Sequence, residues 1–170
     1  KPLTMKYALF LLNIFVFISC QNNPLQTNTE STSGTFVEKS NIPVFSNIQK
    51  VYVPAYSNLY YLDGNNKLYY TVVLSLRNIS FSDTIYFTSI EYYRDNGQLL
   101  RKYLNSPIML APMQSLEYIV DQEDKEGGAG ANFVVSYGIQ PNTKNQPLIE
   151  TVMSGTAGQY GFAFKSEGIP

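Results

Sequence analysis

The stretch KLYYTVVLSLRN, residues 67 to 78, carries the clearest structural signal in the chain. Its side chains alternate between an apolar set and a mixed set. The apolar set is Leu68, Tyr70, Val72, Leu74 and Leu76, and the mixed set is Tyr69, Thr71, Val73, Ser75 and Arg77. A period of two places each set on one face of an extended strand. The stretch therefore predicts a half-buried β-strand with one face toward a core.

Similar alternation recurs on both sides of this strand. In LEYIV (116–120) and ANFVVSYGI (131–139), the residues that share a face are Leu116, Tyr118, Val120, Phe133, Val135 and Tyr137. QKVYVPAYS (49–57) predicts a first strand, and its Pro54 indicates an edge or a break because proline has no amide hydrogen to donate. PLIETVM (147–153) and GFAFKS (161–166) predict the last strands.

The longest of these segments, TIYFTSIEYYRDNGQLLRKYL (84–104), predicts a β-hairpin. Its tip is DNG (95–97), whose residue types tolerate positive φ. The first arm carries two apolar pairs that are out of phase: Ile85 with Phe87, and Ile90 with Tyr92. A bulge near Thr88–Ser89 would bring both pairs to one face.

Turn signals recur about every ten residues, and no helical stripe is present. The sequence therefore predicts an all-β fold, an antiparallel immunoglobulin-like β-sandwich of about eight strands, over residues 46–170.

Composition limits the chemistry that the chain can perform. The 170 residues have a net charge of −1, one cysteine and no histidine. A near-neutral charge of mixed sign does not favour binding to a phosphate backbone, so we expect no nucleic-acid partner. The chain lacks the usual proton shuttle and the commonest transition-metal ligand. We therefore expect a protein that is not an enzyme, with no catalytic residue and no cofactor.

The single cysteine ends an apolar run in LFLLNIFVFISCQNN, residues 9 to 23. A positive start, an apolar core and a small residue before the cut are typical of a secretory signal peptide, here residues 1–19, with 1–4 as an upstream extension. The run is shorter than the ~20 residues of a spanning helix, so a transmembrane anchor is the less favoured alternative. Another alternative is a free thiol on an uncleaved helix.

The residues Phe17-Ile18-Ser19-Cys20 resemble the lipobox of bacterial lipoproteins, with Phe17 where leucine is usual. That resemblance implies cleavage before Cys20 and acylation of its thiol. The polar stretch that follows predicts a lipid anchor and disordered tether over residues 20–45. The expected location is the bacterial cell envelope, at the outer membrane or the periplasmic face, because Gln21 does not argue for inner-membrane retention.

Longer motifs carry two family resemblances. The segments VVLSLRN, IEYYRDNGQLL and SLEYIV, within about residues 68–120, resemble immunoglobulin-like sandwiches of the late-embryogenesis-abundant type. The segments VYVPAYS (51–57), GGAGANFVV (127–135) and PLIETVMSGTAGQYGFAF (147–164) resemble the bacterial domain-of-unknown-function family 3124. The second resemblance implies an exported or envelope protein. It implies no activity, substrate or catalytic residue.

Two loops are candidates for binding. In DQEDKEGGAGAN (121–132), the carboxylates of Asp121, Glu123 and Asp124 offer the oxygen ligands that Ca²⁺ prefers, although the spacing is not that of an EF-hand. The alternative is a solvated acidic hairpin tip.

The glycines of that loop and of SGTAGQYG (154–161) either present backbone amides to an anion or serve as turn residues. If both loops lie at one end of the sandwich, they would line a ligand pocket with Asn132, Ser154 and Thr156. Tyr60 and Tyr61 either offer a stacking platform for a sugar or protein partner, or pack across strands.

These observations favour a non-enzymatic, lipid-anchored envelope protein that contacts the membrane through lipid on Cys20. Its β-sandwich would bind an envelope protein or a glycan. The alternative is a periplasmic module that binds a small ligand or Ca²⁺ through the 121–132 and 154–161 loops.

Replacing Cys20 by alanine tests the anchor. We expect the wild-type protein to enter the detergent phase with the mass of residues 20–170 plus acyl chains, and Cys20→Ala to stay aqueous. The physical reason is that acylation adds ~0.8 kcal/mol for each buried CH₂. Detergent phase partition combined with intact mass measures both properties. Aqueous partition of both proteins, with cleavage elsewhere, would contradict the lipobox interpretation.

Overall fold

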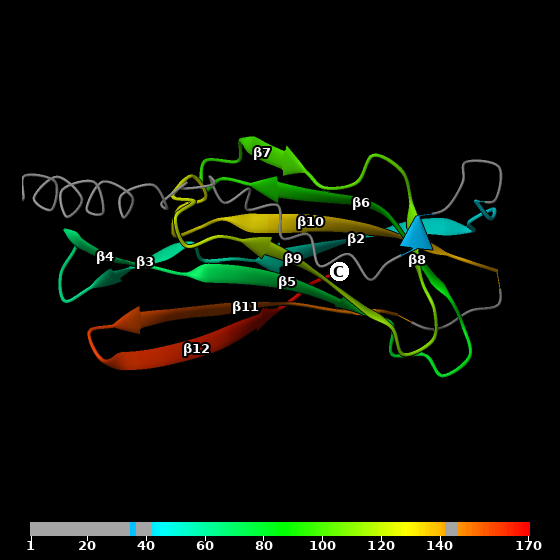
Figure 1. Ribbon diagram of the computed structural model, residues 1–170. Coiled ribbons are helices and arrows are strands. Elements are labelled where there is room, and N and C mark those ends of the chain that lie inside the picture. Colours follow the sequence, from blue (N-terminus) through cyan, green and yellow to red (C-terminus); the bar gives the residue numbers. More distant parts are fainter. Residues whose placement is uncertain (1–34, 37–41, 142–145) are drawn as a thin grey trace, which may run out of the picture.

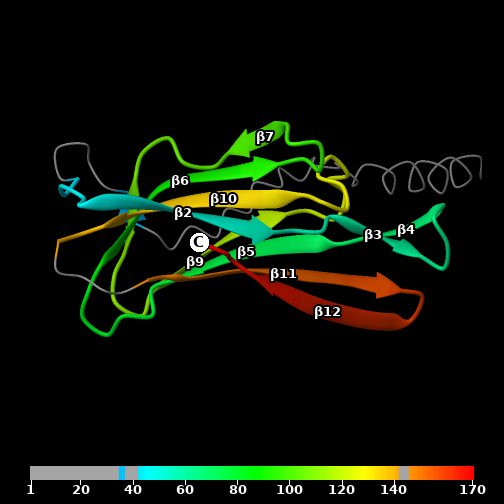
Figure 2. The same ribbon diagram turned by 180° about the vertical axis from the view of Figure 1, so that it is seen from behind.

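The computed structural model describes the backbone of residues 35–36 and the whole of residues 42–141 and 146–170. The predicted signal peptide, Cys20 and most of the predicted tether lie outside these residues. The described chain forms twelve strands and two face-to-face antiparallel sheets, with a projecting two-stranded ribbon (Figures 1 and 2). Within the described part, no helix is long and apolar enough to cross a bilayer.

The larger sheet contains six strands. In spatial order they are β1 (Thr35–Phe36), β8 (Ile108–Leu110), β6 (Ile85–Tyr93), β10 (Asn132–Ile139) and β2 (Asn47–Pro54), with β7 (Leu99–Lys102) also paired to β6. Its β2 edge is partly covered by the C-terminal segment, because the amides of Tyr52 and Ile169 donate to each other's carbonyls at 2.9 and 2.7 Å.

The smaller sheet contains four strands. Their order is β12 (Tyr160–Glu167), β11 (Leu148–Ala157), β5 (Thr71–Arg77) and β9 (Ser115–Val120). The separate ribbon pairs β3 (Asn58–Tyr61) with β4 (Asn66–Tyr69). All of these pairings are antiparallel.

The core lies between the two sheets. The side chains predicted to share inner faces are buried in it, including Val72, Leu74, Leu76, Leu116, Tyr118, Val120, Phe133, Val135 and Tyr137. Because apolar burial contributes roughly 25 cal/mol per Å², this layer is the main source of stability. The prediction of an all-β antiparallel sandwich is confirmed.

The number of strands is higher than the predicted eight, partly because the predicted strand at 67–77 divides at Tyr70. The Tyr70 amide donates to the Ser57 carbonyl at 3.0 Å, and the Tyr70 ring packs edge-on against Phe162 and Phe164. The chain therefore leaves the ribbon at β4 and enters the smaller sheet as β5. Alternation alone continues across this break and does not reveal it.

A second difference concerns the predicted tether at 20–45. Its residues Thr35 and Phe36 form β1, which pairs with Met109 and Ile108 of β8. Part of the stretch expected as a tether is thus attached to the sandwich.

The predicted hairpin and bulge are confirmed. Gly97 has φ of +83° and its amide donates to the Arg94 carbonyl, which closes the turn. The register of β6 against β10 shifts between Ser136 and Tyr137, so that one residue of β6, Thr88, has no Cα partner in the ladder. An extra residue of this kind brings both predicted apolar pairs of β6 to the core.

The sandwich has two different ends. The hairpin end carries the β3–β4 ribbon, the β11–β12 turn and loop 121–131 (Figure 1, left). The entry end carries loops 78–84 and 111–114, together with the segment that leads into β2 (Figure 1, right).

The buried side chain of Asn78 holds the entry end together. Its amide nitrogen donates to the carbonyls of Asp83, Leu110 and Ala111 at 2.7, 3.0 and 2.9 Å. Its oxygen accepts the Ser80 amide at 3.0 Å. One side chain therefore joins the β5–β6 loop to the end of β8 and the loop after it, and this explains why an asparagine directly follows β5.

The substitution Asn78→Ala tests whether these hydrogen bonds stabilise the fold. It leaves buried backbone groups without partners, and such a loss costs about 3 kcal/mol in the free energy of unfolding. Chemical denaturation measures the change, with Asn105→Ala as the control because Asn105 is exposed. Equal stability of the two variants would show that the Asn78 bonds are not needed.

Candidate functional site

The hairpin end brings together the segments that the sequence singled out for binding. Loop 121–131 follows β9, and the turn that joins β11 to β12 lies at the same end as the β3–β4 ribbon (Figure 1). Loops 121–132 and 154–161 therefore lie at the same end of the sandwich, which is the condition under which they could line one pocket.

Loop 121–131 is fixed to the sheets by side chains from its neighbours. The Arg101 guanidinium forms an ion pair and hydrogen bond with the Asp124 carboxylate. The Arg94 side chain donates to the Glu126 carbonyl at 2.8 Å. These contacts indicate an ordered loop that closes the end of the core.

The loop glycines permit close packing. Gly128 has φ of +87°, and a Cβ there would overlap the Asp95 carboxylate. Its amide donates to the Ser57 hydroxyl at 2.8 Å, and that hydroxyl donates back to the Gly128 carbonyl at 3.0 Å. Gly128 therefore serves a structural turn, and its amide is already used within the fold.

Two of the three carboxylates proposed for Ca²⁺, those of Asp121 and Asp124, accept local backbone hydrogen bonds. Asp121 accepts the amide of Glu123 at 2.9 Å, and Asp124 accepts that of Glu126 at 3.0 Å. Over the described residues, no group of three or more His, Cys, Asp or Glu side chains could hold a metal ion. Asp121, Glu123 and Asp124 are therefore not assembled into a ligand set, and calcium binding stays a prediction.

Beneath this loop lies the buried ring of Tyr92. The ring packs against Phe133 in a tilted arrangement with centroids 4.7 Å apart, and the Arg101 guanidinium lies 5.9 Å from its centre. Burial, with a further contribution from the negative charge of Asp124, raises the pKa of Tyr92 above its usual value. The neutral phenol thus packs between loop 121–131 and the core and helps to cover this end of the core.

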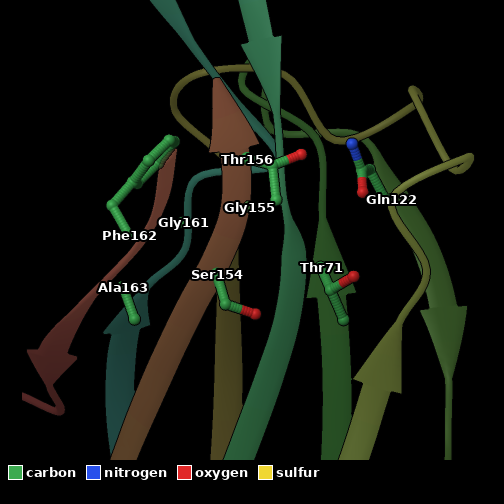
Figure 3. Close-up of a pocket in the computed structure, with 8 residues that line it drawn as sticks. All are labelled: Thr71, Gln122, Ser154, Gly155, Thr156, Gly161, Phe162 and Ala163. Carbon is green, nitrogen blue, oxygen red and sulfur yellow. The ribbon is translucent and has the colours of Figure 1, made fainter. Parts of the chain in front are cut away.

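A shallow depression of about 580 Å³ lies on the outer side of the smaller sheet (Figure 3). Its lining residues are Thr71, Gln122, Ser154, Gly155, Thr156, Gly161, Phe162 and Ala163. Ser154 pairs in register with Thr71 of β5 and with Ala163 of β12. Directly opposed residues on one face have Cβ atoms about 5 Å apart, so the side chains of Ser154 and Thr71 are neighbours. Figure 3 shows the Gln122 side chain reaching this region from the loop after β9.

Gly155 determines how closely β11 approaches the ribbon. A Cβ at this position would lie 2.8 Å from the Tyr70 ring and 3.0 Å from the Tyr69 carbonyl. Only a residue without a side chain fits there. Ser154 and Thr156 on either side therefore point to the outer face, where they line the depression.

A second concavity, of about 430 Å³, adjoins the first and shares Thr156 with it. Its other lining residues are Tyr61, Leu68, Ala157, Gly158, Gln159 and Tyr160. The Tyr160 side chain is 81% exposed, and Tyr61 is 43% exposed. We call the two concavities together the hairpin groove.

The chemistry of the hairpin groove is neutral and amphipathic. Its described lining contains no Asp, Glu, Lys or Arg. Hydroxyl and amide groups lie at one end and exposed tyrosine rings at the other. Such a surface can hydrogen-bond and stack at the same time.

A family model described as "Protein of unknown function (DUF3124)" matches residues 48–170. The chain belongs to this family. The resemblance to family 3124 inferred from the motifs is therefore confirmed, whereas the similarity to late-embryogenesis-abundant sandwiches stays a prediction.

The other comparisons supply no function for this DUF3124 protein. No curated protein matches it. Among solved structures, it is similar to one titled "Crystal Structure of Thermotoga maritima 1070". The sequences are 12% identical, the match covers 71% of this chain and 91% of that chain, and the TM-score is 0.41.

The DUF3124 domain brings together two of the three predicted ligand-binding residues. Ser154 and Thr156 line the hairpin groove. Asn132 does not, because it begins β10 and pairs with Pro54 and Tyr93 in the larger sheet.

Three groove residues were not selected from the sequence. Thr71 was recognised as facing outward, but only the register of β5 with β11 places it beside Ser154. Gln122 comes from loop 121–132, in which the carboxylates were predicted as ligands for Ca²⁺. Tyr160 had a detectable signal, since it lies between Gly158 and Gly161 at a turn.

The raised pKa of Tyr92 predicts a loss of stability at alkaline pH. Below about pH 10 the Tyr92 phenol is protonated in both the folded and the unfolded state, so the buried neutral phenol makes its full contribution to the free energy of unfolding. As the pH rises further, the unfolded state ionises first, so the free energy of unfolding falls. Urea denaturation at increasing pH should show a smaller fall in Tyr92→Phe than in the wild type.

The comparison is normalised to each protein's stability at pH 7. Tyr70 and Tyr137, whose pKa values are also raised by burial, should leave a residual slope in the variant. Parallel curves for the variant and the wild type would contradict a role for the Tyr92 proton.

Proposed function

We propose that this DUF3124 protein is a non-enzymatic, lipid-anchored protein of the bacterial cell envelope that binds a neutral glycan in the hairpin groove. The observation that carries the proposal is the lining of the groove, where exposed tyrosine rings adjoin a row of hydroxyl and amide groups.

Glycan chemistry fits this lining. A sugar ring has apolar C–H faces and a rim of hydroxyls. The rings of Tyr61 and Tyr160 provide surfaces for the apolar faces, and tyrosine retains a polar tip at a wet interface. Thr71, Ser154 and Gln122 supply donors and acceptors that fix orientation. Charged groups are not needed for such a ligand, which agrees with the uncharged lining.

The anchoring part of the proposal is supported by the sequence before the sandwich. The lipobox-like residues end at Cys20, and Thr35 pairs with β8. The groove lies at the hairpin end, opposite the segment through which the chain enters β2 (Figure 1). A domain tethered in this way would present the groove to its surroundings.

Glycan binding is tested by screening the mature protein against neutral envelope polysaccharides and measuring affinity by calorimetry. We expect Tyr160→Ala and Ser154→Ala each to weaken binding, the tyrosine change by about tenfold or more, because exposed aromatic anchors carry most of the energy at recognition surfaces. Tyr52→Ala is the matched control, since Tyr52 is an exposed tyrosine of β2 outside the groove lining.

Three results would contradict the proposal. One is the absence of binding to every neutral glycan tested. A second is an equal loss of affinity in the Tyr52→Ala control. A third is a Ca²⁺-dependent rise in Tm that disappears in Asp121→Asn with Asp124→Asn, which would favour the cation-binding alternative.

A further inference from the structure

Loops 78–84 and 111–114 of the entry end present three large apolar side chains to solvent. Phe81 is 88% exposed, Met113 is 62% exposed and Ile79 is 54% exposed. They come from the two loops that Asn78 joins. We call these three residues the apolar tip.

The loop that carries Ile79 and Phe81 is held in place from within. The intervening Ser80 is 5% exposed, and its hydroxyl accepts the amides of Ser82 and Asp83 at 3.1 and 2.9 Å. With Asn78 and Ser80 fixed on the inner side, alternation directs Ile79 and Phe81 outward. Their exposure is therefore set by the fold.

Met113 is attached to the same structure. Its amide donates to the Ser80 carbonyl at 3.1 Å. Its φ is +62°, and the turn is closed by the Gln114 amide donating to the Ala111 carbonyl at 3.1 Å. Turns with positive φ at this third position normally carry glycine or asparagine. The chain instead places a long apolar side chain there.

The charge of the two ends differs. In the described loops of the entry end, residues 42–46, 78–84, 111–114 and 139–141, Asp83 is the one charged side chain. At the hairpin end, the short segment 121–126 alone carries Asp121, Glu123, Asp124, Lys125 and Glu126. The tip therefore avoids the cost of bringing many charges to an apolar phase.

Followed toward the N-terminus, the backbone of β1 points to the entry end. Thr35 pairs with Met109 and Phe36 with Ile108, in antiparallel register. Followed backward from Phe36 to Thr35, the chain thus runs in the direction that leads from β8 to the turn containing Met113. The fifteen residues from Cys20 to Thr35 can span at most about 50 Å.

We propose that the apolar tip inserts into the surface of the lipid bilayer and orients the anchored domain. The inference rests on the proposed acylation of Cys20 for the initial attachment. Large apolar side chains lower their free energy by entering the headgroup and acyl boundary, and a second attachment makes single-point anchoring more stable. The tip end then faces the membrane, and the hairpin groove faces away from it.

The test places a polarity-sensitive fluorophore on a new cysteine at the tip. The acylated protein carrying Phe81→Cys is labelled and reconstituted into phosphatidylcholine vesicles that contain nitroxide-labelled lipid. Acylation consumes the Cys20 thiol, so the label is confined to position 81. The matched control is Leu62→Cys, because Leu62 is likewise an apolar, 85% exposed turn residue with φ of +62°, at the hairpin end.

We expect the label at 81 to shift its emission to shorter wavelength and to be quenched by the nitroxide, while the label at 62 is not. In a second measurement, the Cys20→Ala chain is added to the vesicles. Ile79→Ser with Met113→Gly should lower its residual partition about tenfold or more, because the buried apolar surface is lost. Equal emission and quenching at positions 81 and 62 would overturn the proposal.

A further experiment distinguishes a protein that is not acylated at Cys20 from an apolar tip that does not contact lipid. If intact mass shows no acyl chain on Cys20, the chain carrying Cys20→Ala is held on nickel-chelating lipid through a histidine tag placed at its N-terminus, and the labels are read again. Lipid contact at 81 then supports the tip although the anchor proposal has failed. An acylated protein whose label at 81 remains in water retains the anchor and overturns the tip.

Discussion

The side-chain amide of Asn78 lies where the smaller sheet passes into the larger one. Three backbone carbonyls converge on it, from the loop after β5, from the last residue of β8 and from the loop after β8. A buried backbone carbonyl needs a donor, and in an irregular loop no neighbouring strand supplies one. Asn78 meets this requirement for both loops at once. The end of β5, the start of β6 and the exit from β8 are therefore fixed by one residue, which also holds both loops of the apolar tip.

The register of β5 links the entry end of the sandwich to the hairpin end. Strand β5 is paired on both sides, with β11 and β9, and its inner face is fully buried. A slip by one residue would turn the core side chains toward solvent, so the register is strongly specified. The same register places Thr71 beside Ser154. The hairpin groove thus depends on the packing of the core, although none of its polar groups belongs to the core.

The sequence predicts those features that arise from local chemistry. Alternation identified the inner faces of β5, β9 and β10, a phase change located the bulge of β6, and the DNG residues located a turn. Features set by contacts between distant segments were not predicted. The break at Tyr70 depends on Ser57 and on the rings of β12, and the separation of Asn132 from Ser154 depends on which sheet each strand joins. Neighbours across strands are not encoded in any single segment.

The short bridge between Tyr52 and Ile169 has a consequence for how the chain folds as it is made. One edge of β2 pairs with β10, and the other edge is covered by Ile169. Both partners are synthesised long after β2 itself. An unpaired strand that contains apolar residues is a template for pairing with other chains. Pairing over such sequence distances is slow because loop closure precedes any gain from contacts. During synthesis, both edges of β2 therefore stay unpaired until β10 and then Ile169 have been made.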